Sequence, residues 1–210
     1  MTEQQTQQRD TEALILQAAE KEFLEKGYSG AKTTSIAEAA GVTHAMFHYY
    51  FRTKDKLFEK IVTEKMEQLK ELMFTAIGNP ELPLKERIEQ GVERHFDFIA
   101  ANPLLPRFIF NELYLNPARV EDTKSGMVAI ATDILNNLQE AIDQEAENGN
   151  CNNADAKMLL LDIISLNIFP FVAEPILSGV LASSGESLDS LLDQRKKENV
   201  KTILGKLNLI

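Results

Sequence analysis

Two histidines in this sequence have the spacing of a metal site. His44 and His48 lie four residues apart, so on a helix their rings would share one face, as in helical zinc sites. Ala45 stands where such a site carries its catalytic glutamate, and no third ligand lies close by in the sequence. We therefore predict no metal site at this pair.

The usual motifs of covalent and phosphate chemistry are missing from the sequence. Cys151 is the single cysteine, so it has no partner for an internal disulfide or a CxxC site, and we assign it no function. The chain contains no GxSxG nucleophile turn, no GxxxxGK loop and no GxGxxG turn. We predict that the protein is not an enzyme and uses no cofactor.

The segment from residue 32 to residue 51 has the order of a helix-turn-helix motif. Ser35 and Glu38 have capping-box spacing at the start of a short first helix. Gly41 supplies the positive φ that ends this helix, and Thr43 caps the helix that follows. Because the second helix of such a motif lies in the major groove, the predicted partner is double-stranded DNA.

The second helix of this motif should divide into a buried side and a DNA-facing side. Phe47 is predicted to face the core, which turns His48 and Tyr49 outward. His44 or His48 could donate to guanine acceptors, and Met46 suits a thymine methyl group. The residues predicted to contact DNA, through bases or phosphates, are Lys32, Thr33, Thr34, Thr43, His44, Ala45, Met46, His48, Tyr49 and Lys54.

The charge distribution agrees with DNA binding by the N-terminal part of the chain. The net charge of -10 opposes nucleic-acid binding, because phosphates are bound through clustered Lys and Arg. Residues 1–62, however, carry eight basic and nine acidic side chains, whereas residues 63–210 carry fourteen basic and twenty-three acidic ones. The acidity therefore belongs to the second part of the chain.

Helical spacing of apolar residues predicts an all-α fold. Residues 1–9 are Gln-rich and lack that spacing, so we predict a disordered arm, followed by a helix from Asp10 or Thr11 to Gly27. Beyond residue 60 the pattern stays helical, with breaks at 78–80, 102–103, 116–117, 148–150 and 183–185. No run of alternating β-branched residues predicts a strand.

The pattern of residues 36–42 and the run of residues 48–58 resemble the TetR family of bacterial regulators. The close resemblance covers residues 10–62, and beyond them only the length and the helix rhythm agree. His44 and Met46 depart from residues that are common in the family, so no family operator is carried over. The resemblance implies a DNA-binding domain at 10–53 and an effector-binding and dimerisation domain at 54–210.

The resemblance also implies a homodimer through the last two long helices, with an inverted-repeat operator whose half-sites lie about 34 to 36 Å apart. Residues 157–181 are apolar on more than one face, which predicts a principal dimer helix with a kink near Pro170 or Pro175. The last helix offers a second partner stripe, made of Leu188, Leu191, Leu192, Val200, Ile203, Leu204 and Leu207.

A small-molecule effector of unknown identity is a further implication of the resemblance, and a repressor would release its operator when this effector binds. Polar and aromatic residues on apolar stripes are the candidates, although a buried core would use the same types. They are His95, Phe96, Ile99, Phe110, Asn111, Tyr114, Asn167 and Phe171.

Two alternatives stay open at this point. One is a transcription activator of the same fold, and the other is a helical adaptor that binds proteins without DNA. The polar N-terminus and the absence of a long apolar run predict a cytoplasmic protein that does not enter a membrane.

Overall fold

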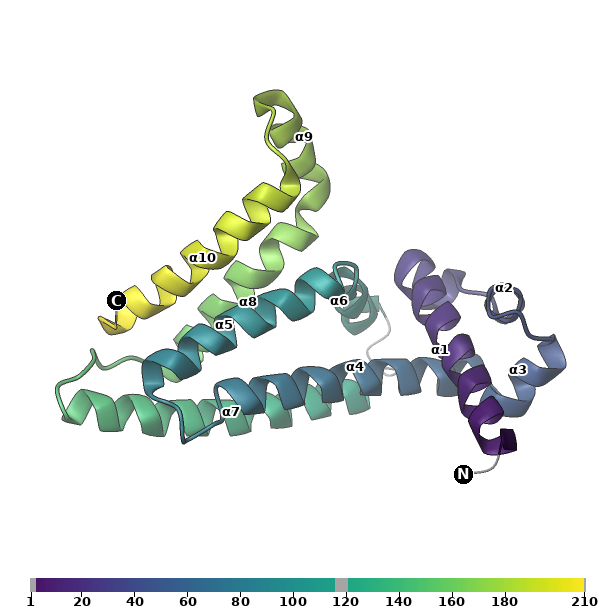
Figure 1. Ribbon diagram of the computed structural model, residues 1–210, viewed down its shortest axis with the longest axis horizontal. Coiled ribbons are helices and arrows are strands. Elements are labelled where there is room, and N and C mark those ends of the chain that lie inside the picture. The colour runs from purple at the N-terminus through teal and green to yellow at the C-terminus, as the bar shows by residue number, and fades with distance from the viewer. Residues whose placement is uncertain (1–2, 116–120, 210) are drawn as a thin grey trace. The chain divides into compact units, whose positions relative to one another are not determined.

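The computed structural model describes residues 3–115 and 121–209, in which all regular structure is α-helical (Figure 1). The predicted all-α fold class is thereby confirmed. The chain forms two compact units, residues 1–67 with 107–123 and residues 68–106 with 124–210.

The first unit is built from five helical segments. These are α1 (Glu3–Gly30), α2 (Thr33–Ala39), α3 (His44–Phe51), the first part of α4 (Lys54–Ala76) and α6 (Leu105–Leu115). Phe23, Phe47 and Phe58 are fully buried in its core, and the rings of Phe23 and Phe58 meet edge to face with centroids 5.6 Å apart. The contact of Phe23 and Phe58 holds α1 against α4, and the buried Phe47 anchors α3 in the same unit.

The N-terminal arm differs from the prediction. Residues 1–9 were expected to be disordered, but α1 begins at Glu3 and continues without a break through the expected start at Asp10. Gln and Glu are good helix formers, so a Gln-rich segment can extend a helix that packing stabilises further along. Gly27 has the predicted positive φ of 68°, yet it kinks α1, and another helical turn follows to Gly30.

The division of the chain also differs from the predicted boundary at residue 53. The first unit extends into α4 as far as residue 67 and includes residues 107–123. Two contacts explain why α6 belongs to it: Phe108 packs on Phe58 with centroids 5.6 Å apart, and the buried Glu112 carboxylate accepts from the Tyr28 N–H at 3.4 Å. Neither contact is local in sequence.

The second unit contains the end of α4, α5 (Leu84–Ala101), most of α7 (Glu121–Glu147), α8 (Ala156–Val172), α9 (Glu174–Ser184) and α10 (Leu188–Leu207). Helices α5, α8 and α10 all pack on one another (Figure 1). The helices end at the predicted breaks, except that residues 116–117 lie outside the described residues.

The last helix turns its apolar stripe toward its own subunit. Ile203, Leu204 and Leu207 are buried in the core of the second unit, beside residues of α5, α7 and α8. The prediction that this stripe faces a partner is therefore wrong for these three residues. Periodicity identifies an apolar face, but it does not tell an internal core from a subunit interface.

Helices α8 and α9 carry a row of exposed apolar side chains instead. They meet at a bend of 66° between Pro170 and Pro175, as predicted, and Phe169 and Ile176 are 65% and 71% exposed. Within the described residues no single helix is long and apolar enough to cross a membrane. Helices α8 and α9 reach that length and apolar content only when they are taken together across their bend.

A buried polar network joins the three central helices of the second unit. The Asn167 amide of α8 donates to the carbonyl oxygen of Val92 at 2.9 Å and to Nδ1 of His95 at 3.1 Å, both on α5. Asn199 of α10 donates to Oδ1 of Asn167 at 2.8 Å. Burial of the imidazole lowers the pKa of His95 to about 4, so the ring is neutral near pH 7.

The lowered pKa of His95 makes the stability of the second unit depend on pH. The unfolded chain takes up a proton near the ordinary pKa of 6.5, whereas the folded chain resists it down to about 4. The free energy of unfolding should therefore fall by about 2 kcal/mol between pH 7 and pH 5 from this residue alone. Urea unfolding of His95→Leu at fixed protein concentration should lack this component, and equal pH dependence in both proteins would contradict the assignment.

Candidate nucleic-acid interface

Helix α3 is held at its start by Thr43 and along its buried side by two phenylalanines. The Thr43 Oγ1 accepts from the Met46 N–H at 3.2 Å, which confirms the predicted cap. Phe47 and Phe51 are buried, while His48 and Tyr49 are exposed. The helix therefore offers a polar outer face on a fixed support.

The turn between α2 and α3 has the predicted geometry. Gly41 adopts a φ of 68°, a conformation that favours glycine, and its N–H donates to the carbonyl oxygen of Glu38 at 3.0 Å. The N–H of Val42 donates to the carbonyl oxygen of Ala37 at 3.0 Å, and Ala37 is buried. The small side chain of Ala37 lets this turn close against α2.

The start of α2 differs from the predicted capping box of Ser35 and Glu38. The N-cap residue is Lys32, whose own side chain makes no capping bond. Its backbone N–H donates to the carboxylate of Glu22 on α1 at 3.2 Å, and Lys26 donates to the same carboxylate at 2.7 Å. Burial raises the pKa of Glu22, but these two bonds and the positive charges of Lys26 and Lys32 outweigh it and lower the pKa overall.

The predicted DNA-contacting residues gather at the start of α2 and along the outer face of α3. Oγ1 of Thr33 lies 3.3 Å from Nε2 of His44, which joins the two helix starts. Gln8 of α1 donates to the hydroxyl of Tyr49 at 3.3 Å. The exposed members are Lys32, Thr34, Thr43, His44, Ala45, Met46, His48 and Tyr49, and Thr33 is half-buried.

The two histidines of α3 lie beside each other, with ring centroids 4.4 Å apart and planes at 87°. Nδ1 of His48 lies 3.1 Å from the carbonyl oxygen of Arg52. No group of three potential metal ligands occurs in the part of the chain that the structure describes.

Lys54 is placed differently from the other predicted contacts. Its Nζ donates to the carbonyl oxygens of Tyr28 at 2.8 Å and Ala31 at 3.0 Å, and it lies 4.2 Å from the centroid of the Tyr28 ring. The hydroxyl of Tyr28 in turn donates to Asp55 at 2.6 Å. Lys54 thus ties the start of α4 to the end of α1, which is a role that the sequence alone did not indicate.

Glu22 and Glu112 are positioning residues that sequence reasoning missed. Glu22 holds the start of α2 from α1, and Glu112 reaches the kinked end of α1 from α6. The spacing of Glu22 and Lys26 is a visible i, i+4 ion-pair signal. Nothing in the sequence links Glu112 to Tyr28, since they are 84 residues apart.

The residues predicted to bind an effector separate into two groups. His95, Phe96 and Ile99 of α5 and Asn167 of α8 are buried, and Phe171 is half-buried with its ring centroid 5.4 Å from that of Phe96. Phe110, Asn111 and Tyr114 are exposed on α6, in the first unit. The structure brings only the first group together.

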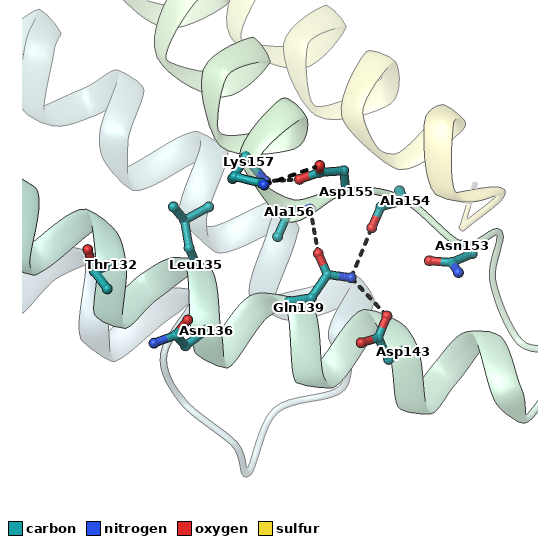
Figure 2. A pocket seen from close by; sticks show the side chains of 10 residues that line it. All are labelled: Thr132, Leu135, Asn136, Gln139, Asp143, Asn153, Ala154, Asp155, Ala156 and Lys157. Carbon is teal, nitrogen blue, oxygen red and sulfur yellow. Dashed lines mark hydrogen bonds and ion pairs between the residues drawn. The ribbon is translucent and has the colours of Figure 1, made fainter.

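The second unit also has an open pocket of about 560 Å³ beside the loop from α7 to α8 (Figure 2). Gln139 of α7 points into it, accepts from the Ala156 N–H at 2.9 Å and donates to Asp143 at 2.8 Å. The other lining residues are Thr132, Leu135, Asn136, Asn153, Ala154, Asp155 and Lys157, so none of the predicted effector residues is among them.

Comparison with known proteins identifies the first unit. The model of the family described as "Bacterial regulatory proteins, tetR family" matches residues 15–61, which include α2 and α3. A Bacillus subtilis (strain 168) protein named YhgD, an uncharacterized HTH-type transcriptional regulator, is 23% identical over 159 residues, covering 76% of this chain and 81% of the relative.

Two further proteins extend the comparison. The HTH-type transcriptional repressor SCO4008 of Streptomyces coelicolor is 34% identical over 102 residues, or 49% of each chain. The transcriptional regulator FadR of Bacillus subtilis, solved in complex with stearoyl-CoA, has the same fold with a TM-score of 0.59. It is 22% identical, and the match covers 90% of this chain and 97% of FadR. The first unit therefore carries the DNA-binding domain of the TetR family of bacterial regulatory proteins, and the chain is a transcriptional regulator.

Proposed function

We propose that the protein binds an inverted-repeat operator as a homodimer and represses transcription until an effector with an acyl chain releases it. The observation that carries the DNA-binding part is the outer face of α3, held by the Thr43 cap and by the buried Phe47 and Phe51. Such a support presents side chains rigidly to base edges. The protein is proposed to act in the cytoplasm and to catalyse no reaction.

The contacts to DNA divide by chemistry. Thr43, His44, Ala45, Met46 and His48 lie at the start and middle of α3, where base edges are read. The exposed Lys32, Thr34 and Tyr49, with the half-buried Thr33, are proposed to bind phosphates, which position the protein on the duplex.

Lys54 is better assigned to holding the domain than to phosphate contact. Two of its three donors are used on the carbonyl oxygens of Tyr28 and Ala31. These carbonyls belong to the kinked end of α1 and to the residue after it, where α1 no longer satisfies them. A substitution at Lys54 would therefore disturb DNA binding through the position of α1.

The dimer is proposed to form through α8 and α9. Both helices carry exposed apolar side chains at helical spacing, and a soluble monomer rarely exposes so long an apolar stripe. The stripe consists of Met158, Leu161, Phe169, Val172, Ile176 and Val180. In the α10 stripe predicted as its companion, Ile203, Leu204 and Leu207 are buried within the subunit and the other four residues are half-buried, so α10 is left out of the proposed apolar contact.

The effector is proposed to enter between α5 and α8, beside the rings of Phe96 and Phe171. An apolar chain suits these rings, and FadR, a structural relative, was solved with stearoyl-CoA. The polar network of His95, Asn167 and Asn199 lies at the same helix pair, so an inserted chain would shift α8 against α5.

Operator binding is the first test. The protein should bind one inverted repeat in its own upstream DNA, with an affinity that falls steeply as salt rises. Tyr49→Ala, which removes a side chain that is 71% exposed on α3, should weaken binding about tenfold. Leu115→Ala on α6, 74% exposed, is the matched control and should bind normally. Failure to bind any operator, with only weak DNA binding that Tyr49→Ala leaves unchanged, would favour the adaptor. A reporter gene that falls silent without the protein would favour an activator.

Lys54→Met separates the two roles of this lysine. If Lys54 holds the end of α1, the variant should lose about 1 to 3 kcal/mol of stability while the salt dependence of DNA binding keeps its slope. A phosphate contact would instead lower that slope by about one and leave stability intact. Thermal melting and salt titrations measure both, and Lys56→Met, an exposed neighbour, should melt like the wild type.

Phe169→Asp tests the dimer surface. A carboxylate in the centre of an apolar interface is costly, so the variant should sediment as a monomer at concentrations where the wild type is a dimer. Gln194→Asp places the same charge on the exposed side of α10 and should stay dimeric. Dissociation by the α10 variant, with Phe169→Asp still dimeric, would place the interface elsewhere.

Stearoyl-CoA is the probe for the effector. It should weaken operator binding between about 5- and 150-fold, the range of ordinary allosteric coupling, whereas free coenzyme A should not. Phe171→Trp fills space next to Phe96 and should bind the operator normally but lose the response. An unchanged operator affinity of the wild type in saturating stearoyl-CoA would contradict an acyl-chain effector.

A further inference from the structure

We propose that His48 reads the exocyclic amino group of an adenine or a cytosine in the major groove, as a hydrogen-bond acceptor. The inference rests on the proposed DNA-binding function and adds the class of base that one residue selects. It also replaces the expectation that His48 donates to guanine.

The hydrogen-bond partner of His48 determines which ring nitrogen carries the proton. Nδ1 lies 3.1 Å from the backbone carbonyl oxygen of Arg52, at the end of the same helix. A carbonyl oxygen only accepts, so Nδ1 must hold the N–H of the neutral ring. Nε2 is then left with a lone pair and no hydrogen.

The neighbouring His44 lacks this constraint. Its Nε2 lies 3.3 Å from the hydroxyl of Thr33, and a hydroxyl both donates and accepts. Either tautomer of His44 is therefore compatible with its contact. Of the two histidines, only His48 is restricted to one tautomer, with its proton on Nδ1, although both side chains are exposed on α3.

A bare Nε2 restricts what His48 can recognise on DNA. In the major groove adenine presents N6 and cytosine presents N4 as donors, whereas guanine presents only the acceptors N7 and O6 and thymine only O4. Phosphate oxygens are also acceptors. The neutral ring of His48 therefore matches an amino group and opposes guanine, thymine and phosphate.

The experiment uses the full chain at pH 8, where an ordinary histidine ring carries a single N–H. An operator is first selected from random duplex DNA. Each adenine is then replaced singly by purine and each cytosine by 2-pyrimidinone, which removes only the amino group, and each guanine by 7-deazaguanine, which removes N7. Dissociation constants are measured for wild type, His48→Phe and His44→Phe, with His48→Ala as a second variant if ring volume disturbs α3.

At one position in each half-site, loss of the amino group should weaken wild-type binding about fivefold, the effect of one net hydrogen bond. The same DNA should carry no penalty with His48→Phe, while His44→Phe should keep the penalty. The pairwise comparison cancels any effect of the base analogue on the duplex itself.

Two other outcomes would overturn the inference. A 7-deazaguanine penalty that disappears in His48→Phe would show that His48 reads guanine, and amino-group penalties that are all independent of His48 would show that it reads no amino group. In both cases the proposed operator binding stands. Failure of the wild type to select any sequence would instead overturn the DNA-binding function, and this inference with it.

Discussion

The helices around α3 depend on the contacts that Lys54 makes between the start of α4 and the end of α1. Helix α1 ends at Gly30, so carbonyl groups of its last turn lack helical partners. Lys54 supplies donors to the carbonyl oxygens of Tyr28 and of Ala31, the residue after the helix. The same ammonium lies over the Tyr28 ring, so one side chain joins the first residue of α4 to the end of α1. Helices α2 and α3 lie between these two helices in sequence, so this contact restrains both ends of the segment that contains them.

Much of the motif around α3 was predictable because its determinants are local. The positive φ of Gly41 and the cap by Thr43 each involve residues within five positions of each other, and the burial of Phe47 follows from helical spacing. The start of α2 was not predictable, since the acceptor that satisfies Lys32 is Glu22 on another helix. Local patterns identify which helices form, and distant partners decide where they begin.

The sequence pattern also did not predict that α6 belongs to the first unit, or that apolar residues of α10 are buried in their own subunit. An apolar stripe must be covered, but its spacing contains no information about what covers it. The α10 stripe around Ile203 and Leu204 is covered by the subunit's own core, whereas the stripe of α8 and α9 remains exposed in the described chain. The sequence therefore indicated α8 for the proposed dimer surface, whereas leaving out α10 required the packed structure.

We propose that the N-terminal half of α3 lies in the major groove. DNA cleavage by an iron chelate attached to this helix tests the placement directly. A Cys151→Ser background carrying Ala45→Cys, linked to an iron chelate, should cut operator DNA inside each half-site with the strand offset of a major-groove source. The same reagent on Glu25→Cys, exposed on α1, should not cut at those bases. A bound operator that is cut from position 25 but not from position 45 would contradict the account.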